Sequence, residues 1–375
     1  MLLRNMKRSL SVVVAAGLLL GASGARADWG LNLPAGVTPI SQTAYSLHML
    51  ILWICVAIGV VVFGAMFISI LRHRKSKGAV PAQFHESTTV EILWTIIPFL
   101  ILVSMAVPAT KALIAMEDTS DSDISIKVTA YQWKWQYEYL DEGIGFFSNL
   151  STPNDQIYGN AEKSANYLLE VDNKMVVPVG KKVRLLLTAS DVIHAWWVPE
   201  LGMKKDAIPG FINEMWVQVD QPGVYRGQCA ELCGRDHGFM PIVVEALSEA
   251  DYSQWVADQQ AASAAAAADD DREMDMGELM TRGEKVYGTH CAACHQANGA
   301  GLPGAFPGLV GSPLIKGPVA GHVDIVMNGK SGTAMAAFGG QLSDADLAAV
   351  ITYERNAWGN DTGDLLQPSD IKAAR

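Results

Sequence analysis

The chain has 375 residues, half of them hydrophobic, and a formal net charge of −11. This length allows two or three domains, and the mean hydropathy of +0.16 is high for a soluble protein, so we expect membrane spans. The negative charge argues against nucleic acid as a partner. It favours a basic protein partner instead, whose approach salt would weaken.

Residues 1–27 are typical of a secretory signal peptide. A positively charged start precedes an apolar core from Leu10 to Leu20, and Ala25-Arg26-Ala27 offers small residues for cleavage. We therefore expect the mature chain to begin at Asp28. The alternative is an amphipathic anchor that is retained.

Two uncharged stretches follow, one from Met49 to Leu71 and one from Ile92 to Thr110. Each is long enough to cross the hydrocarbon core as a helix. The second stretch contains Pro98 and Pro108, which a packed transmembrane helix can tolerate. We predict a transmembrane hairpin within residues 28–115.

The charges beside these stretches predict the orientation of the hairpin. Residues 72–77 read Arg-His-Arg-Lys-Ser-Lys, a basic cluster that should stay cytoplasmic. The mature N-terminus and everything after about Lys111 would then be exported. Glu91 lies at the inner end of the second stretch, where an acidic residue suits a helix N-terminus.

The pattern changes from helix to strand in residues 116–258. Ile124 to Val128 and Met215 to Asp220 alternate apolar and polar residues with a period of two. Turn signals separate the short apolar runs, at Val179-Gly180, Ile208-Pro209-Gly210 and Gln221-Pro222-Gly223. Many short strands with turns between them predict a β-sandwich. Aromatic residues crowd from Tyr131 to Tyr139, and we expect most of these rings to pack in the sandwich.

Metal-binding side chains concentrate in the run from Cys229 to Met240, and His194 lies upstream of it. Thiol, imidazole and thioether ligands favour copper over magnesium or calcium. A blue-copper site needs one Cys, two His and a weak axial Met, so this run has donors for two coppers. A disulfide between Cys229 and Cys233, or a zinc site, is the alternative. His237 and Met240, in register with the cysteines, argue against both.

The run Cys-Ala-Glu-Leu-Cys-Gly-x-x-His-x-Phe-Met, preceded by Asp-Val-Ile-His, resembles subunit II of haem–copper cytochrome c oxidases. The resemblance implies a cupredoxin-like sandwich with a binuclear copper centre called CuA. Cys229 and Cys233 would bridge the two coppers. His194 and His237 would each bind one copper.

The resemblance also implies roles for other residues. Met240 would ligate one copper and the backbone carbonyl of Glu231 the other, while the Glu231 side chain would reach a magnesium ion beside the catalytic subunit. Trp133 matches the surface tryptophan through which electrons enter CuA. Glu91 matches a glutamate at the entrance of a proton path, an alternative to its simple role at the helix start. The family often has Arg where this chain has Phe211, so contacts with the catalytic subunit are expected to differ there.

The segment from Gln259 to Asp271 is mostly alanine and ends in three aspartates. It contains no glycine or proline, so it can be helical in part, but it has no apolar stripe to bury. We predict a solvated linker over residues 259–275 and a separate domain after it.

The last part of the chain contains Cys291-Ala-Ala-Cys294-His295, the attachment signal of a c-type haem. The thiols would add to the haem vinyl groups and the histidine would bind iron. The alternative is a redox Cys-x-x-Cys pair with a chance histidine. Residues 277–288 are expected to be helical, and a second helix is expected to begin at an N-cap, Ser343. We predict an all-α class I cytochrome c domain over residues 276–375.

A sixth haem ligand is expected from the loop between those helices. Met335 is the preferred candidate, because a methionine ligand raises the haem potential. Met327 is expected to pack within a helix, and His322 to lie on the surface. The family often has Pro where this chain has Ala336, so the loop is expected to be less rigid.

The resemblance covers nearly the whole mature chain and implies a subunit II with a fused cytochrome c domain. It would sit in a bacterial plasma membrane, surrounded by lipid, with its copper and haem domains on the periplasmic side. Electrons from a cytochrome c donor would pass through haem c and CuA to catalytic subunit I, which reduces oxygen and pumps protons. Subunit III is expected as a further partner.

Three other functions are alternatives to this expectation. Some nitrous oxide and nitric oxide reductases also carry a CuA domain, but the two-span hairpin before the sandwich favours the oxidase. A copper-delivery protein would not need the haem, Trp133 or a binuclear set of ligands. A quinol-oxidising relative would have lost the copper ligands, which this chain keeps.

Overall fold

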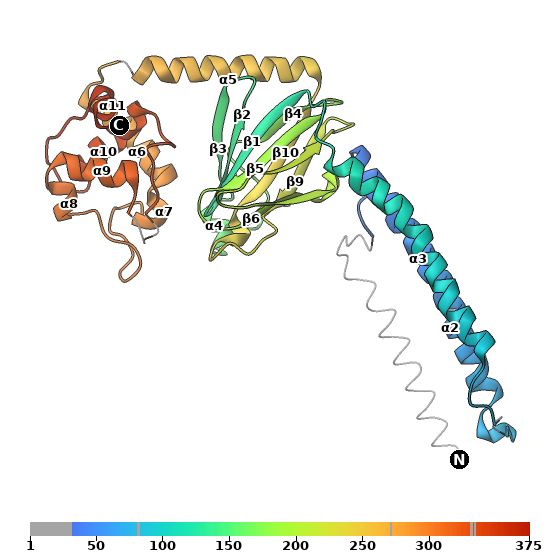
Figure 1. The fold of residues 1–375 in the computed structure, drawn as a ribbon. Helices are drawn as coiled ribbons and strands as arrows, with labels where there is room; N and C mark the ends of the chain where they lie inside the picture. The colour runs from blue at the N-terminus through green and yellow to red at the C-terminus, as the bar shows by residue number, and fades with distance from the viewer. Residues whose placement is uncertain (1–31, 81–82, 271, 331–332, 334) are drawn as a thin grey trace, which may run out of the picture. The chain divides into compact units, whose positions relative to one another are not determined.

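The computed structural model describes residues 32–80, 83–270, 272–330, 333 and 335–375 (Figure 1). The predicted signal peptide, residues 1–27, lies outside the described residues. The chain divides into two compact units. One runs to Asp118 and includes Val198–Lys204, and the other comprises Thr119–Trp197 and Lys205–Arg375.

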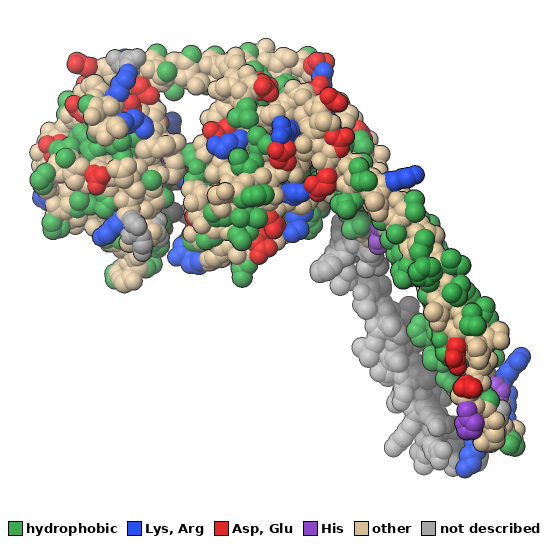
Figure 2. Space-filling view, viewed as in Figure 1, with side chains coloured by type: hydrophobic (Ala, Val, Ile, Leu, Met, Phe, Trp, Pro, Cys, Tyr) green, Lys and Arg blue, Asp and Glu red, His purple; other side chains and the backbone are tan. Residues whose placement is uncertain are grey.

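The first unit contains the predicted hairpin. Helix α2 runs over Pro39–Arg72 and helix α3 over Thr88–Glu117, and both are long and apolar enough to cross a membrane. A short 3-10 turn, η2 (Lys75–Lys77), lies in the basic cluster between them. Pro98 and Pro108 both lie inside α3, as predicted. Hydrophobic side chains cover the outside of the hairpin (Figure 2), as expected of a surface that faces lipid or other spans.

The start of α2 is fixed by a segment from much later in the chain, η3 (Pro199–Leu201) and Gly202. Thr38 caps the helix through Ser41, and its hydroxyl donates to the Leu201 carbonyl at 2.9 Å. Gly202 has a φ of +77°, and a Cβ there would lie 2.6 Å from the Ser41 Cα. Glycine is therefore required at this close approach of two backbones.

The second unit begins with the predicted β-sandwich. One sheet has five strands in the order β3-β2-β1-β5-β8, a second has the order β4-β10-β9, and β6 pairs with β7. β1 pairs with β2 in antiparallel and with β5 in parallel orientation. The strands are β1 (Ile124–Tyr131), β2 (Lys134–Tyr139), β3 (Ile144–Ser148), β4 (Met175–Pro178), β5 (Val183–Ala189), β6 (His194–Val198), β7 (Met203–Ala207), β8 (Asn213–Val217), β9 (Gly223–Gln228) and β10 (Pro241–Leu247).

The alternation in β2 explains the aromatic run. Trp135, Tyr137 and Tyr139 are buried, whereas the residues between them are partly exposed. Successive side chains of a strand point to opposite faces, so one face of β2 enters the core. Between β3 and β4 the chain forms a long loop with one short helix, α4 (Asn154–Ile157).

Helix α5 (Glu249–Asp270) differs from the predicted linker. It is one continuous helix that begins before residue 258, the end predicted for the sandwich. Its first turns pack on the sandwich, because Tyr252 donates to Glu142 at 2.9 Å and the Trp255 ring lies 5.1 Å from that of Tyr139. Tyr252 and Trp255 precede the alanine run, so the boundary drawn from composition fell inside a helix.

The C-terminal part is helical, as predicted. Helix α6 (Met276–His290) crosses α10 (Asp344–Asn356), and the smaller helices are α7 (Ala292–His295), α8 (Pro313–Lys316), α9 (Val319–Asn328) and α11 (Pro368–Ala374). Gly283 permits the crossing, since a Cβ there would lie 2.2 Å from the Ala349 carbonyl oxygen. The N-cap at Ser343 accepts from the Asp346 amide, as predicted.

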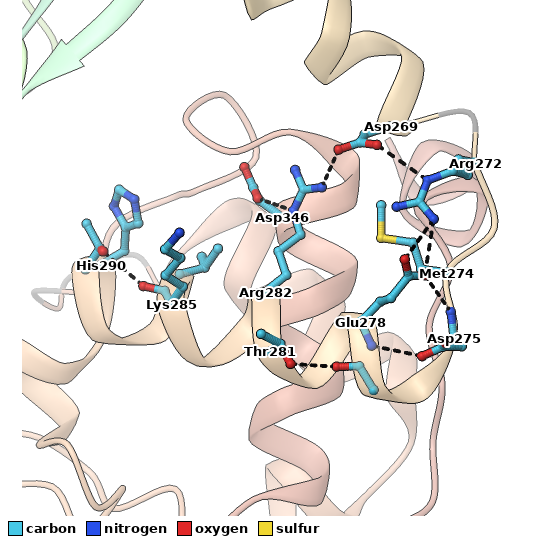
Figure 3. A pocket seen from close by; sticks show the side chains of 13 residues that line it. Asp269, Arg272, Met274, Asp275, Glu278, Thr281, Arg282, Lys285, His290 and Asp346 are labelled. Carbon is cyan, nitrogen blue, oxygen red and sulfur yellow. Dashed lines mark hydrogen bonds and ion pairs between the residues drawn. The ribbon is translucent and has the colours of Figure 1, made fainter.

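A groove of about 930 Å³ runs along α6 (Figure 3). Five of its charged side chains form ion pairs: Arg282 with Asp269 at 3.0 Å and with Asp346 at 2.7 Å, and Arg272 with Glu278 at 3.1 Å. The described residues that line it include neither the copper-binding run nor the Cys-x-x-Cys-His motif. The chemistry predicted from the sequence therefore belongs to other parts of the fold.

Candidate metal centre

The metal-binding side chains predicted in the sandwich come from two loops, the one before β6 and the one between β9 and β10. His194 begins β6, Cys229 follows β9, and Met240 precedes β10. Cys233 lies in the loop between Cys229 and Met240, and His237 starts the 3-10 turn η4 (His237–Phe239) in the same loop. Rigid strands therefore hold both ends of the loop that carries most of the donors.

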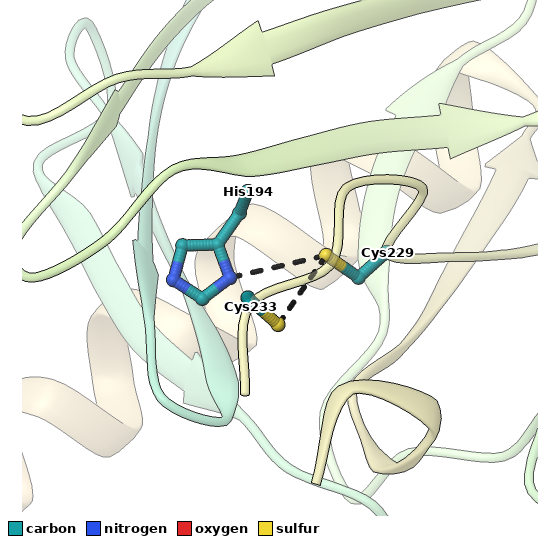
Figure 4. Close-up of side chains that lie close together, drawn as sticks. All are labelled: His194, Cys229 and Cys233. Atoms are coloured by element: carbon teal, nitrogen blue, oxygen red, sulfur yellow. Dashed lines mark hydrogen bonds between the residues drawn. The ribbon is translucent and has the colours of Figure 1, made fainter. Parts of the chain in front are cut away.

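The two thiols lie at the centre of this group. The Cys229 and Cys233 Sγ atoms are 3.8 Å apart, and the His194 Nδ1 atom is 3.8 Å from the Cys229 Sγ (Figure 4). All three side chains are buried, and their ligand atoms lie within 4.8 Å of one another. Buried thiols and imidazole so close together form a ready-made site for a soft or borderline metal.

The other predicted donors surround the same two sulfurs. The His237 Nδ1 atom is 3.4 Å and the Met240 Sδ atom 3.5 Å from the Cys233 Sγ. The Glu231 carbonyl oxygen is 3.4 Å from the Cys229 Sγ. Each sulfur thus has its own histidine, and each has one further weak donor. This arrangement suits two adjacent metal ions bridged by the cysteines better than one.

The two thiols differ in how easily they lose a proton. Burial acts to raise the pKa of Cys229, but hydrogen bonding to His194 lowers it to about 7. Burial and the neighbouring Cys229 raise the pKa of Cys233 to about 12. One thiol of the pair is therefore easily ionised and the other is not. Metal binding must release the second proton, so the affinity should fall at low pH.

Asp191 orients His194 through the ring nitrogen that points away from the cysteines. Its carboxylate lies 2.9 Å from the His194 Nε2 atom, which leaves Nδ1 to face Cys229. Burial acts to raise the pKa of Asp191, but hydrogen bonds from His194 and from the Gln132 and Val192 amides lower it. A carboxylate behind a ligating imidazole fixes its tautomer and its direction.

Trp133 lies against the same loop. Its indole N–H donates to the Cys233 carbonyl oxygen at 3.2 Å, and the Gln132 side chain donates to that oxygen at 2.8 Å. The Arg235 guanidinium lies 5.7 Å from the Trp133 ring centre. The sequence pattern indicated Trp133 but not Gln132 or the pairing of Asp191 with His194. The only signals in the sequence were that Gln132 adjoins Trp133 and that Asp191 begins the run Asp-Val-Ile-His.

The Cys-x-x-Cys-His motif forms a second site in the helical part. Cys291 follows α6, and Cys294 and His295 lie in α7. The His295 Nδ1 atom is 2.9 Å from the Pro307 carbonyl oxygen, which leaves Nε2 for another partner. Burial and the Glu354 carboxylate raise the pKa of Cys291. Two thiols and an oriented imidazole on one turn fit the attachment of a haem group.

The structure also places the other histidine and the two methionines named in the sequence. Met335 lies in the loop between α9 and α10, and Met327 is buried in α9. The expectation for His322 was wrong, because its side chain is only 1% exposed and its Nε2 atom lies 2.8 Å from the Glu354 carboxylate. The partner lies on a different helix, α10, which the sequence around His322 could not reveal.

Three further residues were singled out in the sequence. Glu91 is in the first turn of α3 and accepts from the Ser87 amide at 3.4 Å, as an acidic residue at a helix start does. The Glu231 side chain is exposed, although its carbonyl faces Cys229. Phe211 is exposed as well.

Comparison with known protein families covers both parts of the chain. Residues 26–112 match the transmembrane domain of cytochrome c oxidase subunit II, and residues 124–247 match the periplasmic domain of the same subunit. Residues 278–353 match subunit III of cbb3-type cytochrome c oxidase.

Individual proteins show the same similarity. A probable cytochrome c oxidase subunit 2 of Rickettsia bellii is 39% identical over 253 residues, which are 66% of this chain and 93% of that protein. Cytochrome c oxidase subunit 2 of Arabidopsis thaliana is 40% identical over 62% of this chain and 90% of its own length. The solved periplasmic domain of cytochrome oxidase subunit II from Bradyrhizobium japonicum is 40% identical, with a TM-score of 0.34, over 38% of this chain and 96% of that chain.

Proposed function

This chain belongs to the cytochrome c oxidase subunit II family, and we propose from that premise that it is the electron-entry subunit of its oxidase. As a subunit of a haem–copper oxidase it is part of an oxidoreductase, and subunit I is its implied partner. We propose that it relays electrons from a cytochrome c donor to subunit I, where oxygen is reduced to water and protons are pumped.

The observation that carries the proposal is the convergence of donors on the two sulfurs. We propose that Cys229 and Cys233 bridge the coppers of CuA, and that His194 and His237 complete its two halves. Met240 and the Glu231 carbonyl would be the weak ligands. Their distances from the sulfurs, 3.4 and 3.5 Å, support this division between the two metals. Bound copper supplies a one-electron carrier at this place.

The second site supports a covalently bound haem c. Cys291 and Cys294 would form the thioether bonds, and the orientation of His295 by the Pro307 carbonyl would direct its Nε2 atom to the iron. Met335 is the proposed sixth ligand, because it lies in the loop between α9 and α10 and a thioether favours the reduced haem. We propose that haem c receives electrons before CuA does.

The protein's own residues have distinct tasks in this relay. Trp133 would receive electrons at the surface, supported by its hydrogen bond to the carbonyl of the bridging Cys233. Asp191 holds His194 in place, and the strands β6, β9 and β10 keep the ligand loops rigid. Rigid ligands change little when an electron arrives, and this keeps the transfer fast.

Other proposals rest on the resemblance to the family. The exposed Glu231 side chain would reach a magnesium ion beside subunit I, and Glu91 would lie at the entrance of a proton path. Subunit III and membrane lipid are further proposed partners. We propose a bacterial inner membrane as the location, with the copper and haem domains on the periplasmic side.

Three experiments test this function. The wild type should bind two coppers per chain and give the electron paramagnetic resonance signal of a mixed-valence pair, which Cys229→Ser should abolish. A single copper, or zinc, would refute the copper assignment. Haem should remain on the denatured polypeptide unless Cys291 and Cys294 are both replaced by Ala. The intact complex should consume oxygen when supplied with reduced cytochrome c.

A further inference from the structure

The turn between β1 and β2 consists of Gln132 and Trp133, and it touches both loops that carry the copper ligands. The Gln132 backbone N–H donates to the Asp191 carboxylate at 2.7 Å. Its side-chain amide donates to the Cys233 carbonyl at 2.8 Å. Through these two hydrogen bonds, Gln132 joins the loop of His194 to the loop of Cys233.

The Cys233 carbonyl is the point where Gln132 and Trp133 meet. A carbonyl oxygen has two lone pairs. One accepts from the Gln132 amide and the other from the Trp133 indole N–H, at 3.2 Å. Because both lone pairs are used, the direction of this carbonyl is fixed. The position of the indole ring that donates to it is fixed as well.

The next residue leaves room for this contact. Gly234 has a φ of +118°, and a Cβ there would lie 3.0 Å from both the Gln132 Nε2 atom and the Trp133 ring. The copper loop thus approaches the turn as closely as a residue without a side chain permits.

We propose that Gln132 is a positioning residue for electron entry. It holds the Cys233 carbonyl in the direction that the Trp133 indole needs, and it ties this contact to His194 through Asp191. The inference rests on the proposed role of Trp133. It adds that the seating of the indole is set by a neighbouring amide and not by ring packing alone.

The test removes the donor and keeps the shape of the side chain. Gln132→Met lacks the amide, so the indole should occupy its position on the Cys233 carbonyl less often. Electron transfer from haem c to copper should then slow about fivefold, the shift expected for one lost hydrogen bond. The matched control is Gln136→Met, since Gln136 bonds Tyr131 at 2.9 Å and not the copper loop. The full chain is used, and flash photolysis follows the haem and copper bands separately.

Two readouts separate positioning from damage to the copper site. Copper content and the electron paramagnetic resonance signal should be unchanged in Gln132→Met, and so should reduction of copper by a small diffusing reductant. Fluorine NMR of protein labelled with fluorotryptophan should show a shifted or broadened line for position 133, identified as the line missing in Trp133→Phe.

The outcomes distinguish this inference from the proposed function. If Trp133→Phe transfers electrons at the wild-type rate, the entry role of Trp133 is wrong and the inference falls with it. If Trp133→Phe is slow but Gln132→Met is not, only the inference is overturned. Copper loss in Gln132→Met would also overturn it, because Gln132 would then be holding the metal site together. If the inference holds, the double variant should be no slower than Trp133→Phe alone.

Discussion

A buried pair of ionisable residues, His322 and Glu354, connects α9 and α10 in the cytochrome domain. Their nitrogen and oxygen atoms are 2.8 Å apart, and the two side chains are 1% and 5% exposed. The His322 Nδ1 atom has no hydrogen-bond partner among the described residues. The hydrogen bond to Glu354 is therefore what compensates for burying this imidazole.

Glu354→Ala should destabilise the cytochrome domain by about 3 kcal/mol, because His322 would be buried without a partner. Glu354→Gln, which can still accept a hydrogen bond, should lose less. The control is Glu284→Ala on the exposed face of α6, expected to stay within about 0.5 kcal/mol of the wild type. Denaturant unfolding followed at the haem band measures the differences. Equal losses in Glu354→Ala and Glu284→Ala would contradict the prediction.

A second ion pair predicts a dependence on pH. Arg355 is buried and donates to Asp364 at 2.7 Å, and this hydrogen bond lowers the pKa of Asp364. The pKa is lower in the folded than in the unfolded chain, so the pair stabilises the fold above the unfolded pKa of Asp, about 4. This contribution is lost as the pH falls through the folded pKa.

Asp364→Asn should therefore lower the thermal stability at neutral pH, and the deficit should shrink below about pH 4. Thermal unfolding of the variant and the wild type across this range checks both parts. The neighbouring Asp361→Asn, at an exposed position, serves as the control and should change little. A stability deficit that stays constant with pH would show that Asp364→Asn destabilises the fold for a reason other than the loss of the carboxylate charge.

At the residue scale, the sequence revealed the donors that lie close together in the chain. Cys229, Cys233, His237 and Met240 fall within one loop, so their spacing already placed them on one site. Contacts between distant segments were not visible in the same way. The bond of His322 to Glu354 spans 32 residues and that of Gln132 to Cys233 spans 101. Only the folded chain brings such partners together.

Among the elements, the crossing of α6 and α10 depends on one glycine. A Cβ at Gly283 would lie 2.2 Å from the Ala349 carbonyl oxygen and 2.6 Å from the Tyr353 Cβ. The first of these contacts is with the backbone, so a change of rotamer cannot relieve it. The two helices would have to move apart and open the core between them.

Gly283→Ala should destabilise the domain by about 3 kcal/mol, at the upper end of the usual cost of overpacking. Gly288 lies in the same helix, and a Cβ there would meet nothing within 4 Å. Gly288→Ala should therefore stabilise the helix by about 0.5–1 kcal/mol. Thermal unfolding of the two variants compares the same substitution at a crowded and an open position. Destabilisation of both by the same amount would contradict this account.

At the scale of elements, the hydrophobic periodicity of the sequence predicted the membrane helices and the first strand. The uncharged stretches became α2 and α3, and Ile124 to Val128 became part of β1 (Ile124–Tyr131). Helix α5 was missed in part, because its composition changes at the alanine run while its backbone does not. Tyr252 and Trp255 at its start pack on the sandwich, and this packing decides where the helix begins.

For the whole molecule, the cytochrome domain has a core of its own. The buried cluster around Leu279, Tyr287, Leu347 and Ile351 contains only residues from Met274 onward and none from the sandwich. The proposed copper ligands belong to a different set of strands and loops. Loss of one cofactor should therefore leave the site of the other intact.

Cys291→Ala combined with Cys294→Ala should abolish the bound haem but leave the copper content and its resonance signal as in the wild type. Donor-supported oxygen consumption should fall, whereas reduction of copper by a small diffusing reductant should be unchanged. Copper analysis and spectroscopy of the purified chain measure the first effect. Joint loss of both cofactors would show that the two sites do not fold independently.

The 3.8 Å between the Cys229 and Cys233 sulfurs has a consequence for biogenesis. A disulfide needs its sulfurs about 2 Å apart, so a small movement of the loop suffices to close one. On the outer side of the membrane no glutathione pool keeps thiols reduced. In newly exported chains, oxidation of the two thiols to a disulfide would therefore compete with metal insertion. We predict that metal-free protein aged in air binds no copper until a thiol reductant is added, so the cysteines would have to be reduced before the metal is inserted.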